Sequence, residues 1–241
     1  MSQLIETYCK ELRLGQSIVE NYKMIQADTH ELFLEKLLQL EIENRRLARK
    51  NRYLKQATFD RIKTFEGYSF EKVKLPNTIS LAELKDGKFI DRKENVILYG
   101  SVGTGKTHMI TAIGVNACNR EKTVKFYKTV NLVNDLVEAR KKSNLKKFLE
   151  KLAKYDLLIC DEWGYIPLDS EGAQLLFQVI AQRYEKGSVA ITTNLDFSRW
   201  NGIFYDDKIT SAIIDRLVHH CHLLVFEGSS YRLEHSSISG A

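Results

Sequence analysis

The residues best suited to chemistry form an unbroken run at positions 100–107, with the letters GSVGTGKT. This run matches G-x-x-x-x-G-K-[ST], the pattern of a phosphate-binding loop (Walker A). Glycines in such a loop let the backbone fold tightly, so that successive N–H groups point at phosphate oxygens. Lys106 is then expected to reach the β- and γ-phosphates, and Thr107 to offer its hydroxyl to Mg²⁺. The run therefore predicts a site for ATP with Mg²⁺. The residues expected to contact the nucleotide here are Gly100, Ser101, Val102, Gly103, Thr104, Gly105, Lys106, Thr107 and His108.

Two acidic residues, Asp161 and Glu162, directly follow an apolar run at 157–160. A strand that ends in two acids places both at the carboxyl edge of a parallel sheet, where such folds bind ligands. Asp161 is expected to hold Mg²⁺, together with Thr107. Glu162 is expected to act as the general base that polarises the attacking water. A solvated acidic turn is the alternative, but the pair lies about fifty residues after the phosphate-binding loop, the spacing that the hydrolytic interpretation requires.

Three further polar residues are candidates for the same reaction. Asn194 follows an apolar run at 189–193 and could bind the attacking water or the γ-phosphate, although a turn-forming asparagine fits equally well. Arg216 lies in a helical pattern and could reach the ATP site of a neighbouring subunit, where a guanidinium stabilises charge on the γ-phosphate. Its alternative is a surface pair with Asp215. Arg232 is a second basic candidate near the phosphates.

The elements that must position these residues alternate between short apolar runs and helical stretches. Strands are expected at 95–99, 124–127, 157–160, 189–193 and 223–226, with helices near 106–120, 130–153, 171–186 and 208–220. Five strands separated by helices predict an α/β fold, with a five-stranded parallel sheet covered on both faces. Residues 1–57 are typical of helices, so a small helical N-terminal domain (1–66) is expected before the catalytic core (67–241).

The amino-acid composition indicates the cellular compartment and the class of protein in which this fold is expected. Of 241 residues, 44% are hydrophobic, which suffices for a packed core. The four cysteines are scattered without metal-ligand spacing, and free thiols suit a reducing cytoplasm. The first residues carry charges, and no apolar run approaches membrane-spanning length. A cytoplasmic protein without a membrane partner is therefore expected. His219, His220 and His222 are interpreted as packing and polar residues, because no carboxylate or cysteine pattern accompanies them.

Basic residues are concentrated in one stretch. The net charge of the whole chain is only +5, yet residues 45–63 contain eight lysines and arginines against Asp60 alone. On a helix such residues form a positive face that can follow a duplex backbone without reading bases. A solvated helix face is the alternative. The candidate DNA contacts are Arg45, Arg46, Arg49, Lys50, Arg52 and Lys55.

Several of these segments together resemble the IstB family of AAA+ ATPases, the helper proteins of insertion-sequence transposition, which are related to the DnaC helicase loaders. The resemblance is carried by YCKELRL (8–14), ENVILYGSVGTGKTH (94–108), DLLICDEWGYIPLD (156–169), GAQLLFQVIAQRYEKGSVAITTNL (172–195), AIIDRLVHH (212–220) and GSSYRL (228–233). The phosphate-binding loop and the acid pair are common to all such ATPases. The stretch after the acids and the two C-terminal segments are more selective.

The resemblance assigns roles to several residues and departs from the family at others. It implies that Asn194 is the sensor asparagine, Arg216 an arginine finger, and Arg232 a residue at a second sensor position. Cys160 and Trp163 stand where aliphatic residues are expected, beside the acids but without chemistry of their own. Because the chain ends soon after Arg232, it is expected to lack the helical lid domain of replication initiators.

Three functions are consistent with this sequence. A member of the family would bind duplex DNA largely without sequence preference, form a homo-oligomer with ATP sites between subunits, and stimulate a separate transposase. A DnaC-like loader would share every nucleotide-binding residue and hold a replicative helicase instead. A third possibility is a module in which ATP only organises a binding surface, but the complete set of hydrolytic residues argues against it. No acidic triad for strand cleavage is evident outside the ATP site.

Overall fold

The computed structural model describes residues 3–204 and 206–231 and divides the chain into two compact units, Met1–Arg52 and Tyr53–Ala241. The sequence placed this boundary at residue 66. The division comes earlier because aromatic and aliphatic side chains from residue 53 onward pack into the core of the second unit. These are Tyr53, Leu54, Ala57, Phe59 and Phe65.

The first unit is helical, as expected. It contains α1 (Gln3–Glu11), α2 (Gln16–Asn21), the 3₁₀ turn η1 (Tyr22–Met24) and most of α3 (His30–Ala57). Cys9, Ile18 and Val19 form a small core. The buried carboxylate of Glu41 accepts hydrogen bonds from the Gly15 N–H at 2.9 Å and from Arg45 Nε at 2.6 Å. One charged network therefore joins α3 to the start of α2.

The second unit contains a six-stranded sheet in the order β1-β6-β2-β5-β4-β3. Its strands are β1 (Val73–Lys74), β2 (Asn95–Gly100), β3 (Val124–Lys128), β4 (Leu157–Asp161), β5 (Ser188–Thr193) and β6 (Cys221–Phe226). All five predicted strands are present and run parallel to one another. The two-residue β1 was not predicted, and it pairs antiparallel with β6.

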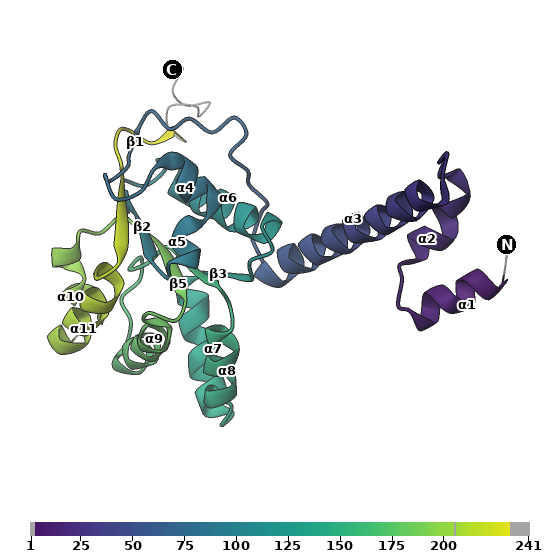
Figure 1. The fold of residues 1–241 in the computed structure, drawn as a ribbon. Helices are drawn as coiled ribbons and strands as arrows, with labels where there is room; N and C mark the ends of the chain where they lie inside the picture. Colours follow the sequence, from purple (N-terminus) through teal and green to yellow (C-terminus); the bar gives the residue numbers. More distant parts are fainter. Residues whose placement is uncertain (1–2, 205, 232–241) are drawn as a thin grey trace, which may run out of the picture. The chain divides into compact units, whose positions relative to one another are not determined.

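Helices cover both faces of this sheet (Figure 1). One face carries α4 (Leu81–Asp86), α5 (Lys88–Asp91) and α6 (Lys106–Asn119). The other carries α7 (Thr129–Lys141), α8 (Leu145–Ala153), α9 (Ser170–Arg183), α10 (Asn201–Phe204) and α11 (Asp207–Val218). The short turn η2 (Phe197–Arg199) leads into α10. The helix expected at 130–153 is broken into α7 and α8, where Ser143 takes a positive φ of 54°.

A hydrophobic core lies on each face of the sheet, and this explains why the strands are apolar at consecutive positions. In β2, Ile97 packs into one core while Val96 and Leu98 pack into the other. A strand with both faces buried needs apolar residues at every position, because successive side chains point to opposite faces. Polar residues follow where the apolar runs of β4 and β5 end, so these polar residues lie at the carboxyl edge of the sheet.

Among the described residues, none of the helices combines the length and apolar character that crossing a bilayer requires. All four cysteines are free thiols, in agreement with their scattered spacing.

Candidate active site

The predicted phosphate-binding loop connects β2 to α6. Gly100, Gly103 and Gly105 have φ values of 151°, 84° and 94°, a region that L side chains rarely adopt. A Cβ atom on Gly100 would lie 2.3 Å from the Phe226 carbonyl oxygen, so a side chain there is also excluded by β6. The loop ends at the N-terminus of the fourteen-residue helix α6, where free N–H groups and the helix dipole favour an anion. The backbone therefore has the form that a phosphate requires.

Lys106 lies in the first turn of α6 with its ammonium group turned into the loop. Its Nζ donates to the Gly100 carbonyl at 2.7 Å and to the Ser101 carbonyl at 2.6 Å. Thr104 Oγ1 donates to the same Ser101 carbonyl at 2.8 Å. A cation at this position is placed beside any phosphate that the loop holds.

The second feature of the site is a cluster of oxygen atoms around Asp161, at the end of β4. Thr107 Oγ1 donates to both carboxylate oxygens of Asp161 at 3.1 Å, and Thr192 Oγ1 donates to Oδ1. Asp161 is 1% exposed, and this burial raises its pKa despite the two hydroxyl donors. A carboxylate and a threonine hydroxyl are hard oxygen ligands of the kind Mg²⁺ prefers, so the pair fits the predicted metal role.

Glu162, unlike Asp161, is exposed to solvent. Its backbone has φ 58°, an unusual value outside glycine, and its N–H donates to Thr192 Oγ1 at 3.0 Å. Its carboxylate lies 3.7 Å from Lys128 Nζ. The two neighbouring acids therefore lie in different surroundings, with Asp161 buried and Glu162 exposed beside Lys128.

Asn194 comes directly after β5, and β5 pairs with both β2 and β4. The register sets Tyr99 beside Thr193 and Cys160 beside Ile191. Asn194 therefore follows a strand lying between the phosphate-binding loop and the acid pair, at the same edge of the sheet. Its side chain is exposed. The position is compatible with the predicted contact to the attacking water or the γ-phosphate.

Arg216 lies at the opposite edge of the sheet. The Asn95 side chain donates to the Leu217 carbonyl at 3.0 Å, which fixes this end of α11 beside the first residue of β2. The loop begins five residues later along β2, roughly 17 Å away at the usual rise of a strand. The guanidinium of Arg216 donates to the Ala212 carbonyl at 2.8 Å and lies 5.1 Å from the centre of the Phe177 ring. It is therefore remote from the phosphate-binding loop of its own chain.

Arg232 lies outside the described residues, but the residues before it reach the loop. The Tyr231 N–H donates to the Gly103 carbonyl at 3.1 Å. A Cβ atom on Gly103 would lie 2.0 Å from Ser230 Oγ. The C-terminal segment thus packs on the phosphate-binding loop up to the last described residue.

Two residues of this site were not identified from the sequence. Thr192 joins β5 to both acids through its hydroxyl, and the sequence marked it only as a neighbour of Asn194. Tyr68 donates to the Gly105 carbonyl at 3.3 Å, its ring centre lies 4.9 Å from that of His108, and burial raises its pKa to about 12. Neither shows a spacing pattern, because both contacts depend on pairing between distant segments.

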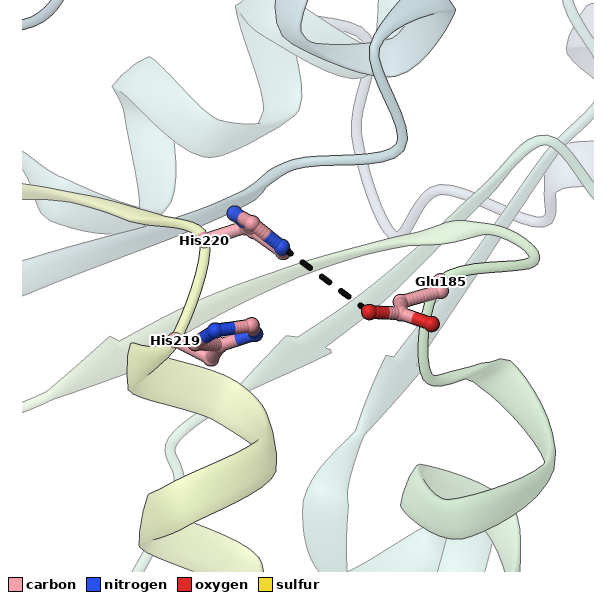
Figure 2. A group of neighbouring side chains, drawn as sticks. All are labelled: Glu185, His219 and His220. Atoms are coloured by element: carbon pink, nitrogen blue, oxygen red, sulfur yellow. Dashed lines mark ion pairs between the residues drawn. The ribbon is translucent and has the colours of Figure 1, made fainter.

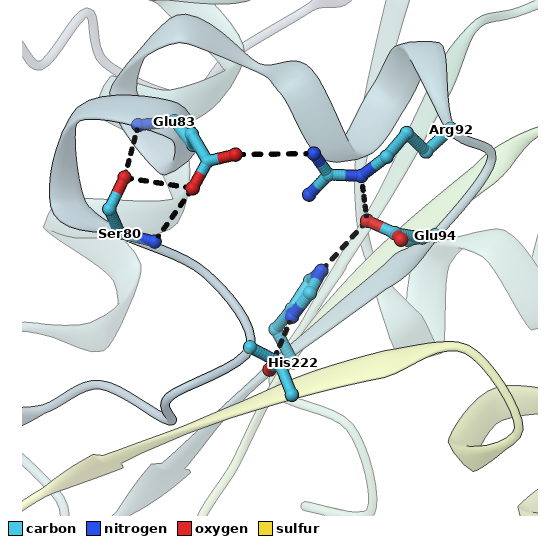
Figure 3. A network of polar contacts seen from close by, with 6 residues as sticks. Ser80, Glu83, Arg92, Glu94 and His222 are labelled. Atoms are coloured by element: carbon cyan, nitrogen blue, oxygen red, sulfur yellow. Dashed lines mark hydrogen bonds and ion pairs between the residues drawn. The ribbon is translucent and has the colours of Figure 1, made fainter.

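Trp163 and the histidines also have defined places. Trp163, which stands where an aliphatic residue is expected, is fully buried against Trp200 and Phe204. His222 is 4% exposed and lies between Glu94 and Thr78, with 2.8 Å from a ring nitrogen to each. Figure 3 shows how this contact continues to the cap of α4. The network consists of Thr78, Ser80, Glu83, Arg92, Glu94 and His222. His222 is therefore a structural residue, as expected.

The candidate DNA contacts all lie on α3. Arg46, Arg49, Arg52 and Lys55 are exposed, and Lys50 is half-buried. The guanidinium of Arg45 is bound within the first unit, to Glu41 at 2.6 Å and to the Arg13 carbonyl at 2.7 Å. Arg45 therefore already has a structural role in this unit.

The chain has a P-loop ATPase fold of the AAA+ class. This fold is defined by the parallel sheet, the phosphate-binding loop after β2 and the two acids at the end of β4, with β5 lying between β2 and β4. Solved structures agree. AMPPCP-bound DnaA from Aquifex aeolicus matches 70% of this chain and 51% of its own, with 22% identity and a TM-score of 0.55. DnaI matches 70% of this chain and 90% of its own, with 17% identity and a TM-score of 0.54. The chain thus spans about half of the DnaA structure.

Sequence comparisons assign the family. The family model described as IstB-like ATP binding protein matches residues 9–239, and this chain belongs to that family. It is 35% identical to the ATP-binding protein of insertion sequence IS5376 from Geobacillus stearothermophilus over 97% of this chain and 95% of the relative. It is 37% identical to the ATP-binding protein of IS21 from Pseudomonas aeruginosa over 86% of this chain and 78% of the relative. The resemblance found in the sequence is confirmed.

Proposed function

We propose that this chain is a Mg²⁺-dependent, DNA-stimulated ATPase that assembles on duplex DNA with ATP and assists the transposase of an insertion sequence. The observation that carries the ATPase role is the contact between Thr107 and Asp161 at 3.1 Å, beside the phosphate-binding loop. It brings the two expected Mg²⁺ ligands together across segments separated by 54 residues. Family membership and the names of the relatives support the link to insertion sequences.

In the proposed reaction, the loop amides and Lys106 hold the β- and γ-phosphates. Thr107 and Asp161 hold Mg²⁺, which neutralises phosphate charge when it is bound. Glu162 accepts a proton from the attacking water, and Asn194 orients that water or the γ-phosphate from the next strand. Thr192 positions both acids through its hydroxyl. His108 and Arg232 remain candidate nucleotide contacts.

The remaining element of the reaction is Arg216. Since it lies at the far edge of the sheet, it cannot reach the phosphates of its own chain without a large rearrangement. In a head-to-tail homo-oligomer the far edge of one subunit can meet the ATP site of the next, because heterologous contacts pair two different surfaces. We therefore propose that ATP sites are shared between subunits, with Arg216 supplied in trans.

DNA binding is proposed for the positive residues of α3 other than Arg45. Arg46, Arg49, Lys50, Arg52 and Lys55 are exposed or half-exposed cations suited to phosphate contacts without base readout. The proposed protein partner is a transposase rather than a replicative helicase, because the relatives that match most of this chain belong to insertion sequences. Copurification of the chain with each candidate partner distinguishes the two.

The test is the ATPase rate against protein concentration, with and without duplex DNA, at low and moderate salt. Shared sites on DNA predict a rate per subunit that rises with concentration and with DNA, and a DNA effect that weakens as salt increases. A rate that is flat in both would leave an ATPase but would remove the DNA-assembly role. Absence of hydrolysis under every condition would favour the non-hydrolysing module.

A further inference from the structure

The opposite end of the catalytic unit contains a second group of potential ligands, remote from the phosphate-binding loop. Glu185, His219 and His220 each offer one ligand atom, and these atoms all lie within 4.8 Å of one another (Figure 2). His220 Nε2 lies 3.9 Å from the Glu185 carboxylate, and the two histidine rings are 4.0 Å apart between centres. From the sequence alone, His219 and His220 are interpreted as packing and polar residues, because Glu185 precedes them by 34 residues and no local pattern connects it to them.

We infer that Glu185, His219 and His220 form a binding site for a divalent transition metal ion, with Zn²⁺ the ion that fits best. Two imidazoles and one carboxylate are a set that zinc uses in three-ligand sites, with the fourth position open to water. Hard Mg²⁺ prefers oxygen ligands, so this site is distinct in chemistry from the Thr107–Asp161 pair. The inference does not depend on the proposed ATPase function.

The distances are compatible with closure around an ion. Zinc ligands lie about 2.0–2.2 Å from the metal, so ligand atoms in a tetrahedral site are about 3.3–3.6 Å apart. The 3.9 Å between His220 Nε2 and the Glu185 carboxylate exceeds this by about 0.3–0.6 Å, and no separation in the group is greater than 4.8 Å. All three side chains are exposed, with His220 at 51% and Glu185 at 58%. Rotations of exposed side chains can therefore bring the ligands together.

The backbone that carries these ligands is held on both sides. The Asn95 N–H donates to the His220 carbonyl at 2.7 Å, and the His219 N–H donates to the Asp215 carbonyl at 3.1 Å. On the other side, the buried guanidinium of Arg183 donates to the Leu152 and Ser188 carbonyls at 2.8 Å. These bonds fix the turn that contains Glu185. Only the side chains have to move, which lowers the entropic cost of binding a metal.

A neighbouring hydroxyl is placed to orient one of the ligands. Tyr184 Oη lies 2.8 Å from His219 Nδ1. When His219 Nδ1 is protonated and donates a hydrogen bond to Tyr184 Oη, the lone pair of His219 Nε2 is free for a metal. A hydrogen bond on the second ring nitrogen is the usual way in which metal-binding histidines are fixed. Tyr184 is therefore the positioning residue of this site.

The site lies between the C-terminal ends of α9 and α11. Glu185 follows the end of α9, and His219 is the first residue after α11. A bound ion would link the ends of these two helices, which the contact between Arg216 and Phe177 also joins. Arg216 precedes His219 by three residues, so the ion would hold the end of the helix that carries it.

The experiment is a titration of the full chain with Zn²⁺ against a chromophoric chelator, in buffer containing excess Mg²⁺. We expect one Zn²⁺ per chain at this site. His219→Ala and His220→Ala should each weaken binding at least about 10-fold, and Glu185→Gln and Tyr184→Phe should also weaken it. His30→Ala is the matched control, since His30 is another exposed histidine outside the group. Circular dichroism of each variant checks that it is folded.

Three results would overturn the inference. The first is no zinc binding by the wild-type chain at concentrations where the chelator releases the ion. The second is equal binding by His30→Ala and by both cluster histidine variants. The third is loss of binding in Cys221→Ser with retention in the histidine variants, which would assign the zinc to a thiol. We expect Cys221 to contribute nothing, because burial raises its pKa to about 12 and disfavours the thiolate.

Discussion

The two edges of the catalytic sheet differ in how complete they are. At the carboxyl edge, the loop glycines, Lys106, Thr107 and Asp161 already contact one another through hydrogen bonds. At the opposite edge, Arg216 rests on Phe177, with its guanidinium bound to the carbonyl four residues earlier in its own helix. The first edge is organised to hold a ligand by itself, whereas the proposed role of Arg216 requires a second copy of the chain. This contrast is the basis of the proposed assembly.

The largest expected effect on ATP turnover comes from a substitution that changes only the carboxyl edge. Glu162→Gln should lower ATP turnover by about 10²–10⁴-fold, because it removes the general base. ATP affinity should change little, since Glu162 is exposed and its carboxylate lies beside Lys128. Steady-state turnover and equilibrium binding of ATP separate the two effects. Glu150→Gln, an exposed acid on α8, is the control. Wild-type turnover in Glu162→Gln would disprove this role.

Arg216→Ala should damage the opposite edge while leaving the carboxyl edge intact. We expect DNA-stimulated turnover to fall by up to about 10³-fold, the lower range for loss of an arginine finger, with ATP binding retained. Arg199→Ala, an exposed arginine in η2, serves as the control in the same assay. Normal stimulated hydrolysis in Arg216→Ala would contradict the shared site.

A smaller effect on turnover is expected when the Thr192 hydroxyl, which contacts both acids, is removed. Thr192→Val removes the hydroxyl that donates to Asp161 and accepts from the Glu162 N–H. Turnover should fall about 10-fold or more because both acids lose a positioning contact, and the fold should lose about 1–3 kcal/mol through unpaired buried groups. Thr192→Ser keeps the hydroxyl and should restore most of the activity. Wild-type turnover in Thr192→Val would show that the Thr192 hydroxyl does not position the acids.

The smallest expected effect is on duplex DNA binding and comes from substitutions in the helical first unit. Replacing Arg46 and Arg49 together by alanine should weaken duplex DNA binding equally for all sequences and lower the salt slope by about 2. Arg45→Ala is an informative contrast, because Arg45 is bound to the buried carboxylate of Glu41. It should destabilise the first unit by about 1–2 kcal/mol. Binding isotherms at several salt concentrations and thermal unfolding distinguish the two outcomes. An unchanged salt slope in the double variant would argue against DNA contacts on this face.

The difference between the edges also explains what the sequence could predict. The loop and the strand carrying Asp161 were predictable because glycine spacing and apolar runs are local patterns. The two-residue β1 was not, since its only signal is its pairing with β6. Thr192 and Tyr68 were missed because their contacts depend on the register of distant segments. The same holds for Glu185, which meets His219 and His220 only after folding.

The central claim is that the ATP site is shared between two copies of the chain, and a mixing experiment tests it most directly. Glu162→Gln and Arg216→Ala are each assayed alone and as an equal mixture, with ATP and duplex DNA. In the mixture, an intact Glu162 from one variant can meet an intact Arg216 from the other at about one quarter of head-to-tail contacts. We therefore predict that turnover recovers to about that share of the wild-type rate. A mixture no more active than the two variants separately would contradict the shared site.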